Sequence, residues 1–128
     1  MQDRPTAIEL LEALTDFMRD RSAHARDRWE RFQFQVAANS MGIIRRELEM
    51  EDGSMRAEWH RLDALLGGHA MPDEPAAFRA RLRGRNEELC ERIRGGALDA
   101  AEDEERLVAH LWETVLDKVR IASPGSAP

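Results

Sequence analysis

The fold is decided by residues 28–51, RWERFQFQVAANSMGIIRRELEME, which contain no proline and a single glycine, Gly42. At 100° per residue, the apolar side chains of this stretch spread over roughly 200° of a helical wheel. One neighbouring helix cannot cover so wide an arc. The stretch therefore predicts a long helix that is covered from two sides, by other helices of the chain or by a second copy in a homodimer. We expect Asp52-Gly53 to end it, because glycine adopts the left-handed cap conformation without strain.

Helical patterns surround this stretch on both sides. Thr6 and Glu9 form a capping box, which predicts a helix over residues 6–20. Segments 54–66, 75–94 and 99–119 each carry apolar residues at helical spacing, and glycine pairs follow the first two. No segment alternates with a period of two residues. The sequence thus predicts an all-α fold, an antiparallel bundle of four or five helices with a long central second helix. The inward positions of the last three segments are Met55, Trp59, Leu62, Leu65 and Leu66, then Phe78, Leu82, Leu89, Cys90 and Ile93, then Leu107, Val108, Leu111, Trp112, Val115, Leu116 and Val119.

Length and charge limit the classes of protein that fit. A chain of 128 residues allows one domain, which we place at 1–122, followed by a disordered tail at 123–128. A net charge of -6 argues against binding to nucleic acid or to an anionic membrane surface. The N-terminus is charged from its third residue, so we expect neither a signal peptide nor a membrane span. The single cysteine, Cys90, fits a reducing cytoplasm.

The sequence offers no recognisable chemistry. A di-metal site in a helix bundle needs Glu-x-x-His pairs, and no carboxylate precedes any of the four histidines by three residues. Cys90 lies beside Leu89 and Ile93, which predicts a buried, unreactive thiol. Glycine-rich phosphate loops are absent from the sequence as well. We therefore expect no catalytic residue, no metal and no cofactor.

Arginines crowd segment 75–94. Arg79, Arg83 and Arg94 form one ridge beside its apolar stripe. Such guanidinium groups either cover the edge of the core while pairing with nearby glutamates, or bind an anion such as the phosphates of a nucleotide or coenzyme A.

Several polar residues lie on or beside apolar faces. Glu47 shares its wheel angle with Trp29 and Val36, which predicts a partly buried carboxylate with a partner. Asn39 and Asn86 lie at similar places on their helices. All three fit either a satisfied structural network or a surface that meets a ligand or partner. The remaining candidates form a ridge at i, i+4 and i+8 that is either solvated or exposed to a partner protein: His110, Thr114 and Lys118.

Three stretches resemble a family of small helical bacterial proteins. They are QDRPTAIELL at 2–11, RFQFQVAANSMGIIRRELE at 31–49, and HLWETVLDK at 110–118. Members of that family tend to be encoded beside kinases of the aminoglycoside-phosphotransferase type and acyl-CoA dehydrogenases, in clusters similar to those that degrade levulinate. This chain departs from the family pattern at Gln33 and Gln35, where His and Arg are expected, and its tail at 121–124 lacks the Asp-Asn before proline.

The resemblance implies an accessory role. In such clusters the kinase-like protein phosphorylates a hydroxyacyl-CoA, and the small protein looks like its helper subunit. We therefore expect a non-catalytic interaction subunit with a kinase-like partner. Two alternatives are a binder of CoA or nucleotide phosphate and a minimal enzyme that uses Glu47 as an acid or base.

Overall fold

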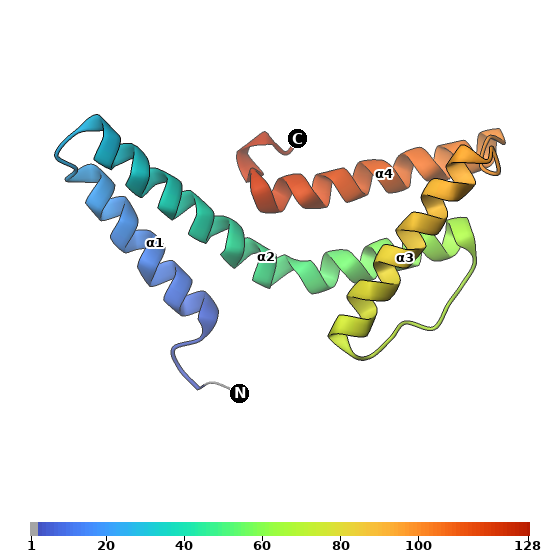
Figure 1. The fold of residues 1–128 in the computed structure, drawn as a ribbon, viewed down its shortest axis with the longest axis horizontal. Helices are drawn as coiled ribbons and strands as arrows, with labels where there is room; N and C mark the ends of the chain where they lie inside the picture. Colours follow the sequence, from blue (N-terminus) through green and yellow to red (C-terminus); the bar gives the residue numbers. More distant parts are fainter. Residues whose placement is uncertain (1–2) are drawn as a thin grey trace. The chain divides into compact units, whose positions relative to one another are not determined.

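The computed structural model describes residues 3–128, and all of their regular structure is helical (Figure 1). The all-α prediction is confirmed. The four α-helices of these residues are α1 (Ala7–Ala23), α2 (Arg28–Leu66), α3 (Pro75–Arg94) and α4 (Ala101–Ala122), and a 3-10 helix, η1 (Pro124–Ser126), follows.

Helix α2 is longer than the sequence predicts. It continues through Asp52 and Gly53 and joins two segments that we expected to be separate helices. Glycine inside a helix costs about 1 kcal/mol relative to alanine, which weakens a helix of 39 residues without ending it. The end expected at Gly53 comes instead at Gly67, whose φ of 96° lies in the left-handed region.

The chain clusters into two compact units. Unit 1 consists of residues 1–52 and 120–128, and unit 2 consists of residues 53–119. Helices α2 and α4 contribute residues to both. The single domain at 1–122 stays a prediction, and its first two residues lie outside the described part of the chain. Helix η1 occupies the middle of the segment 123–128, for which the sequence predicts disorder.

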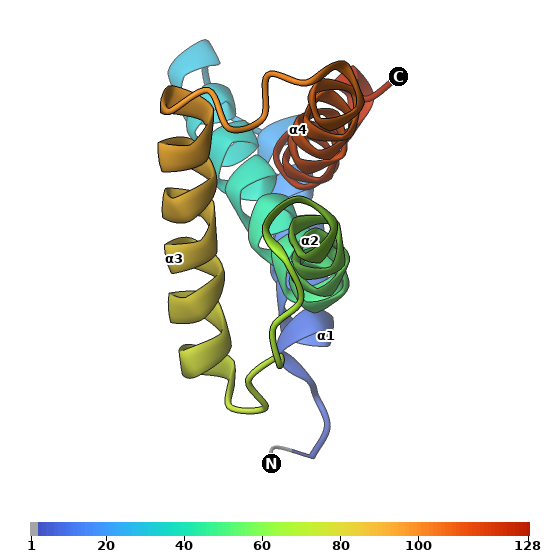
Figure 2. The same ribbon diagram turned by 90° about the vertical axis from the view of Figure 1, so that its right-hand side faces the viewer.

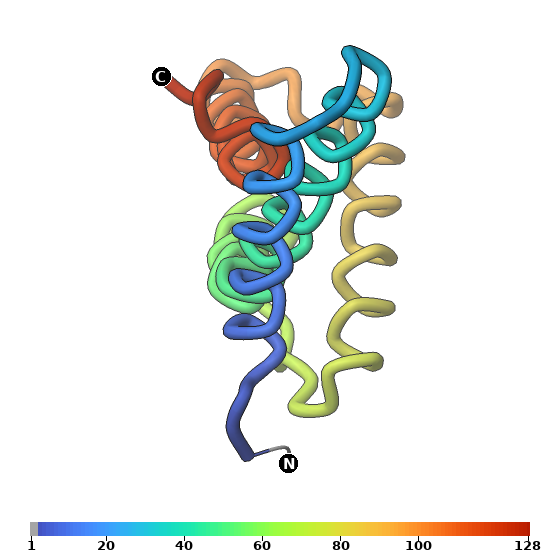
Figure 3. The backbone as a smooth tube through the Cα atoms, turned by 90° about the vertical axis from the view of Figure 1, so that its left-hand side faces the viewer, coloured from blue at the N-terminus to red at the C-terminus, as the bar shows by residue number. Residues whose placement is uncertain are grey.

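In unit 1, α1 and the first half of α2 form an antiparallel hairpin (Figure 3). The predicted capping box is present: the Thr6 amide donates to Glu9 Oε2 at 2.7 Å, and the Glu9 amide donates to Thr6 Oγ1 at 3.2 Å. Arg45 Nη1 of α2 donates to Glu12 Oε1 of α1 at 2.9 Å. Small buried residues on both helices, Thr15, Ser22 and Ala38, allow the two backbones to approach closely.

Unit 1 also holds the end of α4. Arg46 Nε donates to the carbonyl oxygen of Ile121 at 2.7 Å. The last carbonyl groups of a helix receive no hydrogen bond from within the helix. The bond from Arg46 satisfies one of them and connects the end of α4 to α2.

Unit 2 contains the main apolar core. Helix α3 and α4 pack against the second half of α2 (Figure 2). Glu74 caps α3 by accepting hydrogen bonds from the amides of Ala76 and Ala77, at 2.9 and 2.6 Å. The predicted bounds of α3 are confirmed. The apolar core of unit 2 comprises Trp59, Leu62, Leu65, Leu66, Phe78, Leu82, Leu89 and Leu98.

Several residues predicted to face inward do not. Cys90 is exposed, and Ile93 is 39% exposed, so the prediction of a buried thiol is wrong. On α4, Val108, Leu111, Trp112 and Val115 are 46–59% exposed, whereas Leu116 is buried and Leu107 and Val119 are half-buried. Helical spacing identifies an apolar face, but it does not say that this chain covers that face.

Candidate functional site

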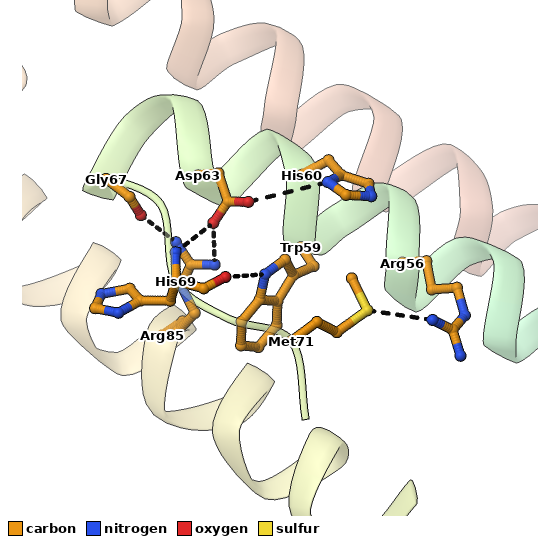
Figure 4. Close-up of polar contacts among 8 residues, drawn as sticks. All are labelled: Arg56, Trp59, His60, Asp63, Gly67, His69, Met71 and Arg85. Atoms are coloured by element: carbon orange, nitrogen blue, oxygen red, sulfur yellow. Dashed lines mark hydrogen bonds and ion pairs between the residues drawn. The ribbon is translucent and has the colours of Figure 1, made fainter. Parts of the chain in front are cut away.

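Unit 2 encloses a charged side chain that is not among the site residues expected from the sequence. Arg85 of α3 is 2% exposed and reaches the end of α2 (Figure 4). Its Nη1 donates to Asp63 Oδ1 at 2.7 Å and its Nη2 to the Gly67 carbonyl oxygen at 2.8 Å. The guanidinium carbon lies 4.5 Å from the centre of the Trp59 ring. The sequence held a signal for this burial, because Phe78, Leu82, Arg85 and Leu89 follow one another at spacings of four, three and four.

Asp63 is the acceptor at the centre of this cluster. Burial alone would raise its pKa, but hydrogen bonds from Arg85 and from the His69 amide outweigh burial and lower the pKa below its ordinary value. Trp59 Nε1 donates to the His69 carbonyl oxygen at 3.3 Å, so the same contacts hold the segment that leads to α3. The two Nη atoms of Arg85 and the Asp63 carboxylate are paired, while Nε of Arg85 has no hydrogen-bond partner among the described residues. The paired groups stabilise the connection between α2 and α3.

A second polar cluster lies between α2 and α4 of unit 2. Arg61 Nη2 donates to Thr114 Oγ1 at 3.2 Å and lies 3.8 Å from Asp117 Oδ2. His110 is 2% exposed, and Thr114 donates to its carbonyl oxygen at 2.9 Å. The expectation of an exposed ridge is therefore wrong for His110, which is buried, and correct for Lys118, which is exposed. Thr114 is half-buried.

His110 has an unusual environment. Burial lowers its pKa below 6.5, and the positive charge of Arg61 lowers it further, against the opposite effect of Glu58. Both effects favour the neutral imidazole. Its Nδ1 atom has no hydrogen-bond partner among the described residues, and neither does Nε of Arg61.

The other predicted site residues are not brought together. Glu47 is exposed, so the prediction that it is partly buried and paired is wrong. It lies on the outer face of α2, which the described chain does not cover. Asn39 is exposed and borders a hollow with Arg19, Ser22 and Gln35. Asn86 is half-buried, and its Nδ2 donates to Glu58 Oε1 at 2.7 Å, which fits the structural one of its two interpretations.

The arginine ridge of α3 is exposed. Arg94 Nη1 pairs with Glu91 Oε1 at 2.6 Å, and Arg79 also has an interaction partner. Arg83 and Arg94 are eleven residues apart, about 16 Å along a helix, so one phosphate group cannot touch both. The three arginines of this ridge, Arg79, Arg83 and Arg94, therefore do not form one site for a single phosphate group.

Both units expose large apolar side chains. In unit 1, the outer sides of both hairpin helices expose large side chains: Leu10 42%, Leu14 46%, Phe17 55%, Trp29 66%, Phe32 54%, Val36 47%, Ile44 48% and Leu48 54%. In unit 2, α4 exposes Val108, Leu111, Trp112 and Val115. Where such side chains are adjacent, as the stacked rings of Trp29 and Phe32 are, they mark places where a protein meets a partner.

Within residues 3–128, no three His, Cys, Asp or Glu side chains gather closely enough to bind a metal ion. Over the same residues, each helix is too short or too polar to cross a bilayer.

A family model described as "Domain of unknown function (DUF6285)" matches residues 23–126 of the chain. The match covers most of the chain, which therefore belongs to this family of helical proteins. No curated protein and no solved structure matches it significantly.

Proposed function

We propose that this protein is a non-catalytic accessory subunit that binds a kinase of the aminoglycoside-phosphotransferase type and assists its action on a hydroxyacyl-CoA. The single observation that carries the interaction role is the exposed apolar surface of the unit 1 hairpin. The kinase and its substrate class come from the family resemblance of the sequence.

The hairpin surface consists of Leu10, Leu14 and Phe17 on α1 and Trp29, Phe32 and Val36 on α2. On α1 these residues lie roughly 160° around the helix from Glu12, Asp16 and Arg19, which line a polar hollow with Gly42 and Arg45. Thr15 and Ser22 of α1 are buried and Glu12 accepts a hydrogen bond from Arg45 of α2, while the apolar side of α1 is exposed.

On α2 the same division holds. Ala38 is buried in the hairpin, and Trp29 lies roughly 180° around the helix from it. The rings of Trp29 and Phe32 stack with centroids 5.8 Å apart, and both stay more than half exposed. Aromatic residues at the centre of an interface supply much of its binding energy. The wide apolar arc of residues 28–51, which needs cover from two sides, thus keeps one side available for a partner.

The test is co-elution with an aminoglycoside-phosphotransferase-like kinase of the kind that the resemblance implies, followed by a kinase assay on a hydroxyacyl-CoA with and without this chain. We expect the two proteins to elute together and the kinase rate to rise. The double variant Phe17→Ser, Phe32→Ser should elute separately and leave the kinase at its basal rate. Ile93→Ser, which removes an exposed apolar side chain from α3, is the control and should behave as the unaltered chain. Separate elution and equal rates with the unaltered chain would discard the proposal.

The alternative is a binder of CoA or nucleotide phosphate through Arg79, Arg83 and Arg94. The ion pair of Arg94 with Glu91 and the length of the ridge both weigh against it. Isothermal titration of the isolated chain with CoA would detect such binding, and its loss in Arg83→Ala would favour this alternative.

A further inference from the structure

Helix α4 has two faces of opposite character within unit 2. The face toward α2 carries His110 and Thr114, which lie against Arg61, and Leu107, which packs on the core. The opposite face carries Val108, Leu111, Trp112 and Val115, all exposed. On these two faces, His110 and Thr114 are turned inward, and Val108, Leu111, Trp112 and Val115 are available to a partner.

The exposed face follows the spacing of helices that pair with one another. Glu104, Val108, Leu111, Val115 and Lys118 succeed each other at intervals of four, three, four and three residues. This is the a/d repeat of a coiled coil, with apolar residues in the middle and charges at the two ends. Glu104 and Lys118 are exposed, and no ion pair joins either side chain to another described residue.

We propose that α4 pairs antiparallel with α4 of a second copy of this chain, about a two-fold axis beside Leu111. In this arrangement Val108 lies opposite Val115 of the second copy. Glu104 lies opposite Lys118 of the second copy, and the symmetry repeats both contacts. A two-fold interface must be complementary to itself, and this pattern meets the requirement because its opposite charges stand equally far from Leu111.

The charges also select the direction of pairing. Parallel helices would place Glu104 against Glu104 and Lys118 against Lys118, and both contacts are repulsive. Antiparallel pairing turns both into attractions. Lys118 is the chain's only lysine. No other lysine can therefore take its place when its charge is reversed.

The size of the surface sets the expected affinity. Four half-exposed apolar side chains, one of them tryptophan, offer on the order of 400 Å² per copy. A stable interface buries about 800 Å² per partner. The pairing is therefore a reversible association with a dissociation constant in the micromolar range.

Sedimentation velocity over a concentration series tests the proposal with the intact chain. We expect the unaltered chain to shift from monomer to dimer. Glu104→Lys and Lys118→Glu, each alone, place like charges at both contacts and should raise the dissociation constant about tenfold. An equimolar mixture of these two variants should dimerise about as well as the unaltered chain, because a mixed dimer has an attractive pair at both ends. Arg83→Glu, an exposed charge reversal on α3, is the matched control and should have no effect.

The mixture separates pairing between copies from effects within one helix. Acidic residues near the start of a helix and basic residues near its end are favourable in any single copy, but that effect does not depend on mixing. A mixture that behaves as the average of the two variants would overturn the proposal. The proposal would also be overturned if the chain stayed monomeric up to about 0.5 mM, a concentration far above the expected dissociation constant. A dimer that neither Glu104→Lys nor Lys118→Glu weakens would overturn it as well.

Cross-linking tests the direction independently. In a Cys90→Ser background, Leu111→Cys lies beside the two-fold axis and should form a disulfide between copies when treated with diamide. Val108→Cys lies about 10 Å along the axis from its own copy and should not. Equal yields from the two variants would indicate parallel pairing, and no disulfide from either would exclude pairing through α4.

Discussion

Replacing Arg85 by methionine tests whether the buried ion pair of unit 2 holds α2 and α3 together. Methionine has a similar length and no polar group, so it keeps most of the packing and removes the charge. The substitution removes the hydrogen bonds to Asp63 and to the Gly67 carbonyl, together with the contact to the Trp59 ring.

The expected loss follows from these contacts. Each hydrogen bond of a charged group is worth about 1.5–3 kcal/mol, and a cation over an aromatic ring adds about 1 kcal/mol. Two effects reduce the total. The Asp63 side chain is 28% exposed and regains contact with water, and the methionine side chain recovers apolar burial. We therefore expect the free energy of unfolding to fall by about 3 kcal/mol.

Urea denaturation followed by circular dichroism at fixed protein concentration measures this loss. With a slope near 1.5 kcal/mol per molar urea, the midpoint should fall by about 2 M. Arg94→Met is the matched control. It removes an arginine from the same helix with an equally short ion pair, at 2.6 Å, but both partners are more than 70% exposed. Such a pair contributes at most about 1 kcal/mol, so its midpoint should barely move. Equal midpoints for the two variants would refute the assignment of a structural role to burial of Arg85.

Three further outcomes are expected. Because burial lowers the pKa of His110, the unfolded chain binds a proton at that residue more readily than the folded chain does. The free energy of unfolding should therefore fall as the pH drops below 6.5. Urea midpoints at pH 7.5 and 5.5 should differ less in His110→Gln than in the unaltered chain, and an equal difference would contradict this. Gly53→Ala should raise stability by about 0.5–1 kcal/mol, since Gly53 is inside α2 and an added Cβ meets nothing within 4 Å. Gly67→Ala should lower stability because Gly67 has a positive φ. The thermal midpoints of the two variants should move in opposite directions. Cys90, being exposed, should react with a thiol reagent in the folded chain as fast as in urea, and strong protection would contradict its placement.

The sequence by itself determined the helices, since capping and glycine signals are local. The Thr6 and Glu9 capping box and the bounds of α3 depend on neighbouring residues only, and both agree with the structure. Gly53 shows where local signals fail. A single glycine can end a helix or lie within it, and contacts along the rest of α2 decide between these outcomes.

Only the tertiary structure decided which apolar and polar residues are covered. Glu47 and Arg85 occupy equivalent positions on the apolar faces of their helices, yet Glu47 is exposed and Arg85 is buried. The difference lies in the partners, because Arg85 meets Asp63 and a free carbonyl group at the end of α2, while the described chain offers nothing to Glu47. On α4, Val108, Leu111, Trp112 and Val115 face outward and His110 faces inward, since the buried face is the one that meets Arg61. Helical periodicity defines the faces of a helix, and the free energy of contacts between elements distant in sequence selects the face that is buried.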